Sequence, residues 1–165
     1  MNKLLQQDKV RTKKLPRFQI LLRKSQRGGG ITSLFYKIFY KLSANKSHIE
    51  ISTKCKIGGG LYIGHAYCIT INPNAQIGKN CNIHKGVTIG QENRGVRRGC
   101  PIIGNEVWIG INATIVGNVK IGDDVLIAPN TFVNCDIPDH SIVFGNPCII
   151  KHKNNATEGY INNKV

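Results

Sequence analysis

Isoleucine and valine recur at every sixth position through most of this chain. The count needs two phase shifts, a two-residue slip before Ile71 and a longer interruption before Ile103. Thirteen of its fourteen positions are Ile or Val, although Ile supplies only 24 of the 165 residues. The positions are Ile51, Ile57, Ile63, Ile71, Ile77, Ile83, Ile89, Ile103, Ile109, Ile115, Ile121, Ile127, Val133 and Asp139.

The neighbouring positions also follow this period of six. The residue after the Ile is often Gly, which predicts a tight corner with positive φ: Gly58, Gly64, Gly78, Gly90, Gly104, Gly110 and Gly122. The fifth position is small or apolar, so we interpret Cys55 and Cys81 there as small inward-facing hydrophobes. A period of six fits neither a helix nor a simple strand. It fits a parallel β-helix, in which fourteen hexads at three per coil form between four and five coils.

A helix is predicted over residues 31–43, before the repeat begins. Six apolar residues form one stripe on it: Ile31, Leu34, Phe35, Ile38, Phe39 and Leu42. Lys37, Lys41 and Lys46 lie beside or after this stripe. Two interpretations stay open. We favour a stripe that caps the open first coil, because terminal repeats of a solenoid need covering. The alternative is an arm that lies on an anionic membrane surface.

Several strings of the repeat resemble the hexapeptide-repeat acyltransferases. They are IGHAYCITINPNAQIGKNC, GVTIG, VWIGINATIVGNVKIGDDVLIAPNTFV and IPDHSIVFGNPCII. The nearest branch is similar to serine acetyltransferase and its relatives in surface-polysaccharide gene sets, over about residues 48–150. The resemblance implies a mainly β fold, a left-handed parallel β-helix, a homotrimer, and acetyl-CoA bound in the groove between neighbouring subunits. The left hand comes from the resemblance alone, since crossovers between parallel strands are generally right-handed.

The domain boundaries follow from these patterns. We expect a basic N-terminal arm with an amphipathic helix at residues 1–47, the β-helix at 48–150 with a loop at 91–101, and a C-terminal tail at 151–165. Serine acetyltransferases carry a much longer helical N-terminal region that drives higher assembly. This chain shows no such region, so we expect a trimer rather than a hexamer.

His65 is the predicted catalytic base. Acetyl transfer to a hydroxyl needs a base for the hydroxyl proton and donors for the oxyanion. His65 follows Gly64 at a coil corner, where the similar serine acetyltransferases carry their catalytic His. The resemblance also places a carboxylate fifteen residues earlier, which is Glu50 here. We expect Glu50 to orient His65 from the adjacent coil. The alternative is a solvated charge at the first coil.

The loop at residues 91–101 is the predicted acceptor-binding segment, because long excursions from a rigid repeat are often functional. The similar enzymes end an equal-length loop in Arg-His-Pro, whereas this chain has Gly99-Cys100-Pro101. Gly64 also replaces the family's acidic residue before the catalytic His. Arg94, Arg97 and Arg98 could bind a carboxylate or phosphate. We interpret Cys100 as a substitute substrate-binding residue rather than a nucleophile activated by His65.

Coenzyme recognition is predicted to rest mainly on backbone groups along one edge of the β-helix. By resemblance, the amides near Gly90, Gln91 and Ile111 and beside Pro129 would line the pantetheine arm, although Pro129 itself donates no hydrogen bond. Trp108 would pack against the same groove, or fill a subunit contact instead. Lys120, Lys151 and Lys153 are candidates for the CoA phosphates on charge alone, with a solvated face as the alternative.

The formal charge of +14 is confined to one end of the chain. Residues 1–47 hold 12 basic residues and one acid, whereas residues 48–165 hold 11 basic and 8 acidic residues. Residues 48–165 lack the basic surface interleaved with aromatic side chains that is typical of nucleic-acid-binding proteins, so we expect no nucleic-acid partner. No signal peptide or membrane span is evident, which favours a cytoplasmic protein with reduced cysteines, peripheral at the membrane if the arm binds lipid. Because the six Cys form no CxxC pair, we expect no metal.

The sequence therefore predicts an acetyl-CoA-dependent O-acetyltransferase that uses His65 as a general base. Because the serine-holding groups are replaced, a sugar hydroxyl of a surface or capsular polysaccharide is the favoured acceptor. L-serine, acetylated to O-acetylserine for cysteine biosynthesis, is the alternative. A non-catalytic scaffold or binding module is the alternative of a different class.

Overall fold

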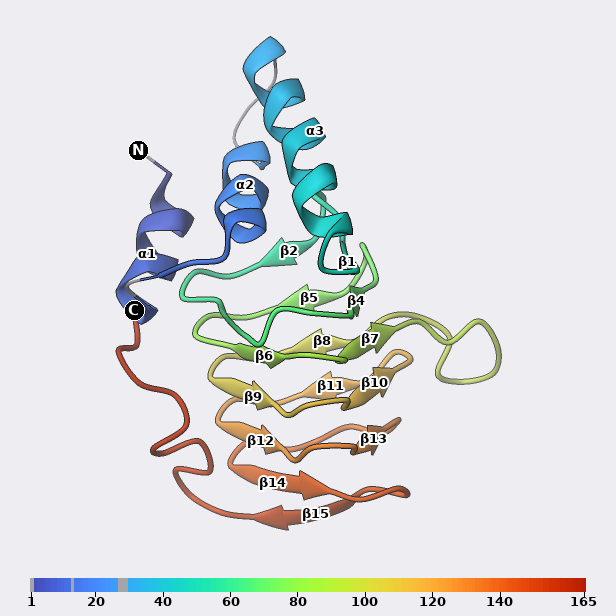
Figure 1. Cartoon of the computed structure of the whole chain (residues 1–165). Coiled ribbons are helices and arrows are strands. Elements are labelled where there is room, and N and C mark those ends of the chain that lie inside the picture. The colour runs from blue at the N-terminus through green and yellow to red at the C-terminus, as the bar shows by residue number, and fades with distance from the viewer. Residues whose placement is uncertain (1, 13, 27–29) are drawn as a thin grey trace.

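The chain folds into a three-sided, left-handed parallel β-helix of about five coils. The computed structural model describes residues 2–12, 14–26 and 30–165. Three helices lie at the end where the β-helix begins, and the strands stack below them coil by coil (Figure 1). The predicted fold class is thus confirmed, with the helical arm in the expected place.

Each side of the prism is one sheet, and successive strands along the chain pass from one sheet to the next. Sheet A consists of β1 (Ile49–Ile51), β4 (Ile69–Ile71), β7 (Thr88–Gly90), β10 (Thr114–Val116) and β13 (Phe132–Val133). Sheet B consists of β2 (Lys56–Ile57), β5 (Gln76–Ile77), β8 (Ile102–Ile103) and β11 (Lys120–Ile121). Sheet C consists of β3 (Tyr62–Gly64), β6 (Asn82–His84), β9 (Val107–Ile109), β12 (Val125–Ile127), β14 (Ser141–Phe144) and β15 (Ile149–His152).

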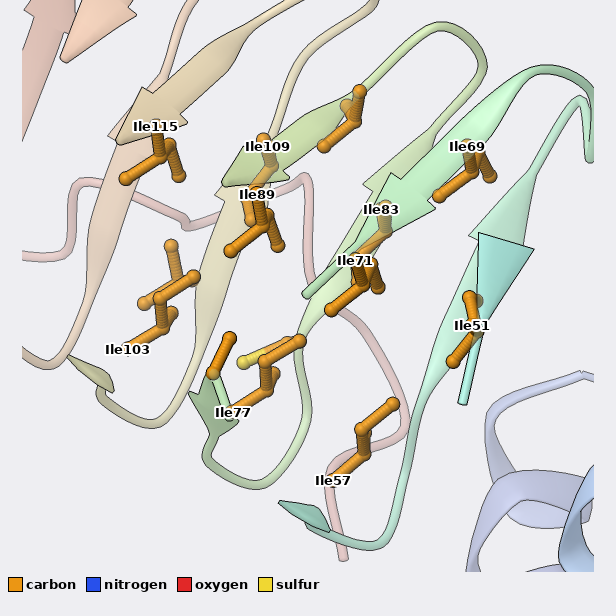
Figure 2. Close-up of a cluster of buried hydrophobic side chains, with 14 of the residues drawn as sticks. Ile51, Ile57, Ile69, Ile71, Ile77, Ile83, Ile89, Ile103, Ile109 and Ile115 are labelled. Atoms are coloured by element: carbon orange, nitrogen blue, oxygen red, sulfur yellow. The ribbon is translucent and has the colours of Figure 1, made fainter. Parts of the chain in front are cut away.

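The hexad isoleucines form columns of stacked side chains inside the prism (Figure 2). Ile51 is the register partner of Ile71, and Ile71 is the partner of Ile89. Each of these side chains is at most 3% exposed. The fifth hexad positions are buried as well, including Cys55 and Cys81. Burial of one such Ile contributes about 1.5–3 kcal/mol, so the repeat itself supplies most of the core.

The last position of the predicted repeat is wrong. The six-residue count reaches Asp139, but Asp139 is exposed and Ile137 fills the interior instead, with a parallel bridge to Ile121. The corner after Val133 is two residues shorter than the others, so the inward position arrives early. The count resumes from Ile137 to Val143, six residues later.

The reason expected for the hexad glycines is also wrong. None of the seven has the positive φ that we predicted. They are needed instead because the coils approach closely at these points. A Cβ atom at Gly78 would lie 2.4 Å from the carbonyl oxygen of Gly104, and one at Gly110 would lie 2.6 Å from the backbone nitrogen of Pro129. The left-handed residues lie two positions further along, as at Asn80 and Asn112.

Three helices precede the prism: α1 (Lys3–Arg11), α2 (Arg17–Ser25) and α3 (Ile31–Asn45). Only α3 was predicted explicitly. Phe18 and Leu22 of α2 and Tyr40 and Ala44 of α3 pack on the first coil and join its core. These four residues therefore cover the open end of the solenoid.

A buried ion pair anchors α1 and α2 on the first coil. The side chains of Asp8 and Arg23 are both 0% exposed, and Arg23 Nε lies 2.8 Å from Asp8 Oδ2. Asp8 also accepts hydrogen bonds from Gln19 Nε2 and from the backbone N–H of Leu61. Arg23 in turn donates to the carbonyl oxygen of Ile57. Part of the charge of the arm is thus structural rather than available to a partner.

The apolar stripe of α3 does not cap the first coil, contrary to the interpretation that we favoured. Its six residues are between 48% and 75% exposed. The opposite face of the helix, with Ser33, Tyr40 and Ala44, is the buried one. The cap is formed by this opposite face together with α2, because the stripe points away from the prism. The exposed stripe is instead consistent with the second interpretation, in which the arm lies on an anionic membrane surface.

The C-terminal segment folds back over sheet C instead of leaving the prism. Strand β15 pairs antiparallel with β14 and crosses the boundary predicted at residue 150. The carboxylate of Asp124 then accepts hydrogen bonds from Thr157 N and Oγ1 and from Ala156 N, and lies 2.9 Å from His140 Nδ1. Val165 reaches Asn80 near α1 (Figure 1).

Candidate active site

The edge between sheets C and A, here called the C–A edge, is built from four stacked corners. Each corner connects a strand of sheet C to the next strand of sheet A. Backbone hydrogen bonds link the corners: Gly86 N donates to Tyr67 O, Asn112 N to Lys85 O, and Asn130 N to Ile111 O. The C–A edge is therefore a rigid column running along the prism.

His65 protrudes from the C–A edge because the first of these corners has two extra residues. Ile63 and Ile83 are register partners, yet Ile71 follows Ile63 by eight residues, whereas Ile89 follows Ile83 by six. The insertion is His65–Ala66. His65 has a left-handed backbone with φ of 51° and an exposed side chain. Ten other non-Gly residues in the described part of the chain share this conformation, among them Asn112 and Asn130 on the same edge, so the insertion rather than the φ angle distinguishes His65. The slip in the sequence count and the predicted base are thus the same feature.

Glu50 lies on β1, one coil before His65. Its register partner is Thr70, which follows the His65 corner on β4, and its side chain is exposed. Within the residues that the structure describes, Glu50 and His65 form neither a hydrogen bond nor an ion pair within 4.0 Å. The predicted orienting role of Glu50 stays a prediction.

The ring of His84 covers Gly64, the residue before His65. Gly64 and His84 are register partners on β3 and β6. His84 Nδ1 lies 3.0 Å from the carbonyl oxygen of Ile109, so Nδ1–H donates and Nε2 keeps its lone pair. Burial lowers the pKa of His84, and the charge of nearby His65 lowers it further, although the bond to Ile109 raises it. His84 is therefore a neutral hydrogen-bond acceptor beside the His65 corner.

His84 is not among the site residues predicted from the sequence. A signal was present, because His84 follows the inward Ile83 at a hexad position that elsewhere holds Gly seven times. Without the fold, the ring could not be placed over Gly64. The ring of His84 fills the space that a side chain at position 64 would need.

The loop at residues 91–101 leaves the opposite end of sheet A from His65 (Figure 1). Glu92 and Gly99 exchange two backbone hydrogen bonds of 3.0 Å, which closes the loop at its base. Arg94, Arg97 and Arg98 are exposed. The structure thus keeps the three arginines together in solvent but does not bring them to His65 of the same chain.

Cys100 belongs to a small polar cluster at the base of this loop. Its Sγ lies 3.3 Å from Asn72 Oδ1, and Asn72 Nδ2 donates to Gln91 Oε1 at 3.0 Å. Burial raises the pKa of the Cys100 thiol, which disfavours the reactive thiolate. The cluster lies a strand length away from His65. Within one chain, both observations argue against a nucleophilic Cys100.

The residues predicted to bind CoA divide between two ends of sheet A. Ile111 and Pro129 lie on the C–A edge, in the same column as the His65 corner. Gly90 and Gln91 lie at the opposite end, where the loop begins. Only the first pair shares an edge with His65 within one chain.

Trp108 and the lysines proposed for the CoA phosphates lie elsewhere. Trp108 packs on the outer face of sheet C between His84 and Tyr160, with ring centroids 4.7 and 5.1 Å away. Lys120 lies on sheet B, because the six-residue period turns it onto the third face, away from the C–A edge. Lys151 lies on β15 with its Nζ 5.7 Å from the centroid of the Phe144 ring, and Lys153 follows that strand. The eight predicted residues therefore do not form one groove in a single subunit.

Two further properties bear on the kind of site. Among residues 2–12, 14–26 and 30–165, no three His, Cys, Asp or Glu side chains are grouped so that they could hold a metal ion. No helix in the same described ranges is long and apolar enough to span a bilayer.

Comparisons with known proteins agree with this geometry. Residues 100–135 match the family model described as bacterial transferase hexapeptide (six repeats). A serine acetyltransferase of Helicobacter pylori (strain ATCC 700392 / 26695) is 37% identical over 97 residues, which cover 59% of this chain and 57% of that protein.

Two solved structures also resemble the chain. The serine acetyltransferase of Neisseria gonorrhoeae in complex with serine gives a TM-score of 0.65 at 30% identity, over 81% of this chain and 53% of that one. The enzyme of Brucella abortus strain S19 in complex with coenzyme A gives 0.68 at 25% identity, over 82% and 53%. The chain therefore spans little more than half the length of these relatives.

Proposed function

We propose that this chain, which belongs to the hexapeptide-repeat transferases, is an acetyl-CoA-dependent O-acetyltransferase. The observation that carries the proposal is the His65–Ala66 insertion, which projects an imidazole from an otherwise regular edge. The relatives support it, since the B. abortus enzyme was solved with coenzyme A.

In the proposed reaction, His65 removes the proton from an acceptor hydroxyl while that oxygen attacks the carbonyl carbon of the acetyl thioester. The resulting tetrahedral intermediate collapses, the C–S bond breaks, and the CoA thiolate takes the proton back from His65. Glu50 would orient the imidazole and stabilise its protonated form.

L-serine is the first acceptor to consider. The similar proteins of H. pylori and N. gonorrhoeae are serine acetyltransferases, and the latter was solved with serine. This evidence favours serine over the polysaccharide acceptor that we expected from the sequence.

A sugar hydroxyl remains the second candidate because of one specific observation. The ammonium group of an amino acid is best held by a carboxylate, and His84 leaves no room for an acidic side chain at position 64. The neutral Nε2 of His84 fits a hydroxyl donor instead. The two acceptors therefore differ in the group that the His65 corner must bind.

A homotrimer would bring the two parts of the site together. Within one subunit His65 and the arginines of the loop lie at opposite ends of sheet A. A neighbouring subunit that placed its loop against the His65 corner would join the base to Arg94, Arg97 and Arg98. Co-expression of His65→Ala chains with Arg97→Ala/Arg98→Ala chains tests this arrangement, because mixed trimers regain activity only if the site is shared.

One assay tests the proposed activity directly. Release of free CoA from acetyl-CoA is measured with L-serine, with nucleotide sugars and with glycans as acceptors. We expect His65→Ala to lower turnover by about a hundredfold or more, and His152→Ala, which changes another exposed imidazole, to leave it intact. Near-normal turnover of His65→Ala would remove the assigned base. No CoA release with any acceptor would favour a non-catalytic scaffold.

A further inference from the structure

The apolar face of α3 holds six of the fourteen large hydrophobic side chains that are exposed in the described part of the chain. Six large side chains on one side of a 15-residue helix are about half exposed or more: Ile31 75%, Leu34 59%, Phe35 58%, Ile38 49%, Phe39 48% and Leu42 58%. The buried residues of α3 lie on its other side. Contiguous apolar patches of this kind mark protein or membrane contacts.

The arm that carries this face is cationic, and its single acidic residue is buried. Asp8 is the only acid in residues 1–47, and it is fully buried against Arg23. Seven basic residues in the described part of the arm are exposed: Lys3, Lys9, Lys14, Arg17, Lys37, Lys41 and Lys46. An apolar helix face with a cationic surround is complementary to an anionic lipid surface.

The placement of α3 suits such a contact. Its C-terminal end rests on the first coil, and its N-terminal end points away from the prism (Figure 1). The stripe is thus free of the β-helix along its length. Pairing with the same arm of a second copy would bring two strongly basic surfaces together, which is repulsive, whereas an anionic bilayer neutralises them.

We propose that α3 docks this protein on anionic membrane surfaces, with Ile31, Leu34, Phe35, Ile38, Phe39 and Leu42 inserted at the interface and the exposed lysines against the headgroups. The helix lies in the plane of the interface and does not cross it. This contact does not depend on the proposed acetyltransferase activity. It places the first coil, which carries Glu50 and the His65 corner, on the side of the prism nearest the bilayer.

Co-sedimentation of the full chain with vesicles tests the proposal. The probes are vesicles of phosphatidylcholine alone and vesicles with about one quarter phosphatidylglycerol. We expect binding to the anionic vesicles only, weakening as salt is raised. Phe35→Ser/Phe39→Ser should weaken it at least about tenfold, and Lys37→Gln/Lys41→Gln/Lys46→Gln by a similar factor.

Matched controls use exposed residues outside the arm. Val96→Ser removes an apolar side chain that is 96% exposed, and Lys54→Gln/Lys56→Gln/Lys79→Gln removes the same number of charges from the prism. Both should bind vesicles like the unchanged protein. Circular dichroism verifies the fold of every variant. Absence of binding to anionic vesicles, or equal binding by the arm variants, would overturn the proposal. A lower oligomer mass for Phe35→Ser/Phe39→Ser without lipid would do so too, because the face would then be a subunit contact.

Discussion

A Cβ atom at Gly64 would lie 2.6 Å from Cδ2 and 2.8 Å from Nε2 of the His84 ring. The two residues are register partners on neighbouring coils, so neither can change size without affecting the other. The corner that carries His65 therefore packs on the imidazole of His84, whose orientation is fixed by its hydrogen bond to the carbonyl oxygen of Ile109.

This relationship predicts a coupled effect of substitutions. Gly64→Ala should destabilise the protein by about 1–3 kcal/mol, as other overpacked positions do. His84→Ala creates room for the new methyl group, so the double variant should lose less than the sum of the two single losses. Urea unfolding of the four proteins measures this coupling free energy. Additive losses would contradict the proximity of the two side chains.

Cys100→Ala should keep most of the turnover. The thiol is protonated because burial raises its pKa, and its Sγ is engaged with Asn72 rather than with His65. Steady-state kinetics with acetyl-CoA measures the effect, and mass spectrometry of the enzyme during turnover examines the thiol itself. A large loss of kcat together with an acetylated Cys100 would reverse this interpretation.

The Asp8–Arg23 pair should be essential for attachment of the arm. Asp8→Asn leaves the guanidinium of Arg23 buried without its counter-charge, which should cost about 3–5 kcal/mol of unfolding free energy. The double variant Asp8→Leu/Arg23→Met should be less destabilised than Asp8→Asn, because it leaves no unpaired charge. Glu158→Gln, which changes an exposed carboxylate, is the control. Similar unfolding midpoints for Asp8→Asn and Glu158→Gln would refute the role of the pair.

Asp124 should make the C-terminal segment sensitive to acid. Burial alone would raise the pKa of Asp124, but hydrogen bonds from His140, Thr157 and Ala156 lower it from 3.8 to about 2. Because the folded-state pKa is the lower one, the stabilisation is complete above 3.8 and is lost as the pH falls toward about 2. The protection of the Ala156 and Thr157 amides against hydrogen exchange should fall as the pH is lowered across this range. In Asp124→Asn the protection should be low at every pH. Protection that does not change with pH in the unchanged protein would exclude this role.

The repeat was predictable because its signal is periodic and local. The inward-facing Ile and the small residues at the fifth position recur at a fixed spacing. This spacing alone predicts which side chains are buried, and therefore predicts the β-helix. Asp139 was wrongly predicted to face inward because counting in steps of six cannot detect a corner that is shorter by two residues. The bridge between Ile121 and Ile137 reveals the shorter corner. His65 was predicted from its place after Gly64 and from the family resemblance. The structure adds that it coincides with the slip in the count, and its catalytic role stays a prediction.

The remaining features depend on contacts that no local pattern encodes. Asp8 and Arg23 are fifteen residues apart in a sequence that reads as uniformly basic, and their pairing requires α1 and α2 to fold onto the first coil. The stripe of α3 was correctly predicted as a helix face, but periodicity cannot tell which face meets the protein. The position of His84 over Gly64 required the register between two coils.

The two longer corners show how this architecture accommodates change. The insertions at His65–Ala66 and in residues 91–101 lengthen single corners, yet the strands on either side keep their partners, as the Ile71–Ile89 and Ile77–Ile103 pairs show. The proposed chemistry and the stability of the fold are thus assigned to separate parts of each coil. A descendant of this chain could acquire a new acceptor by altering one corner, with no compensating substitutions in the column of isoleucines beneath it.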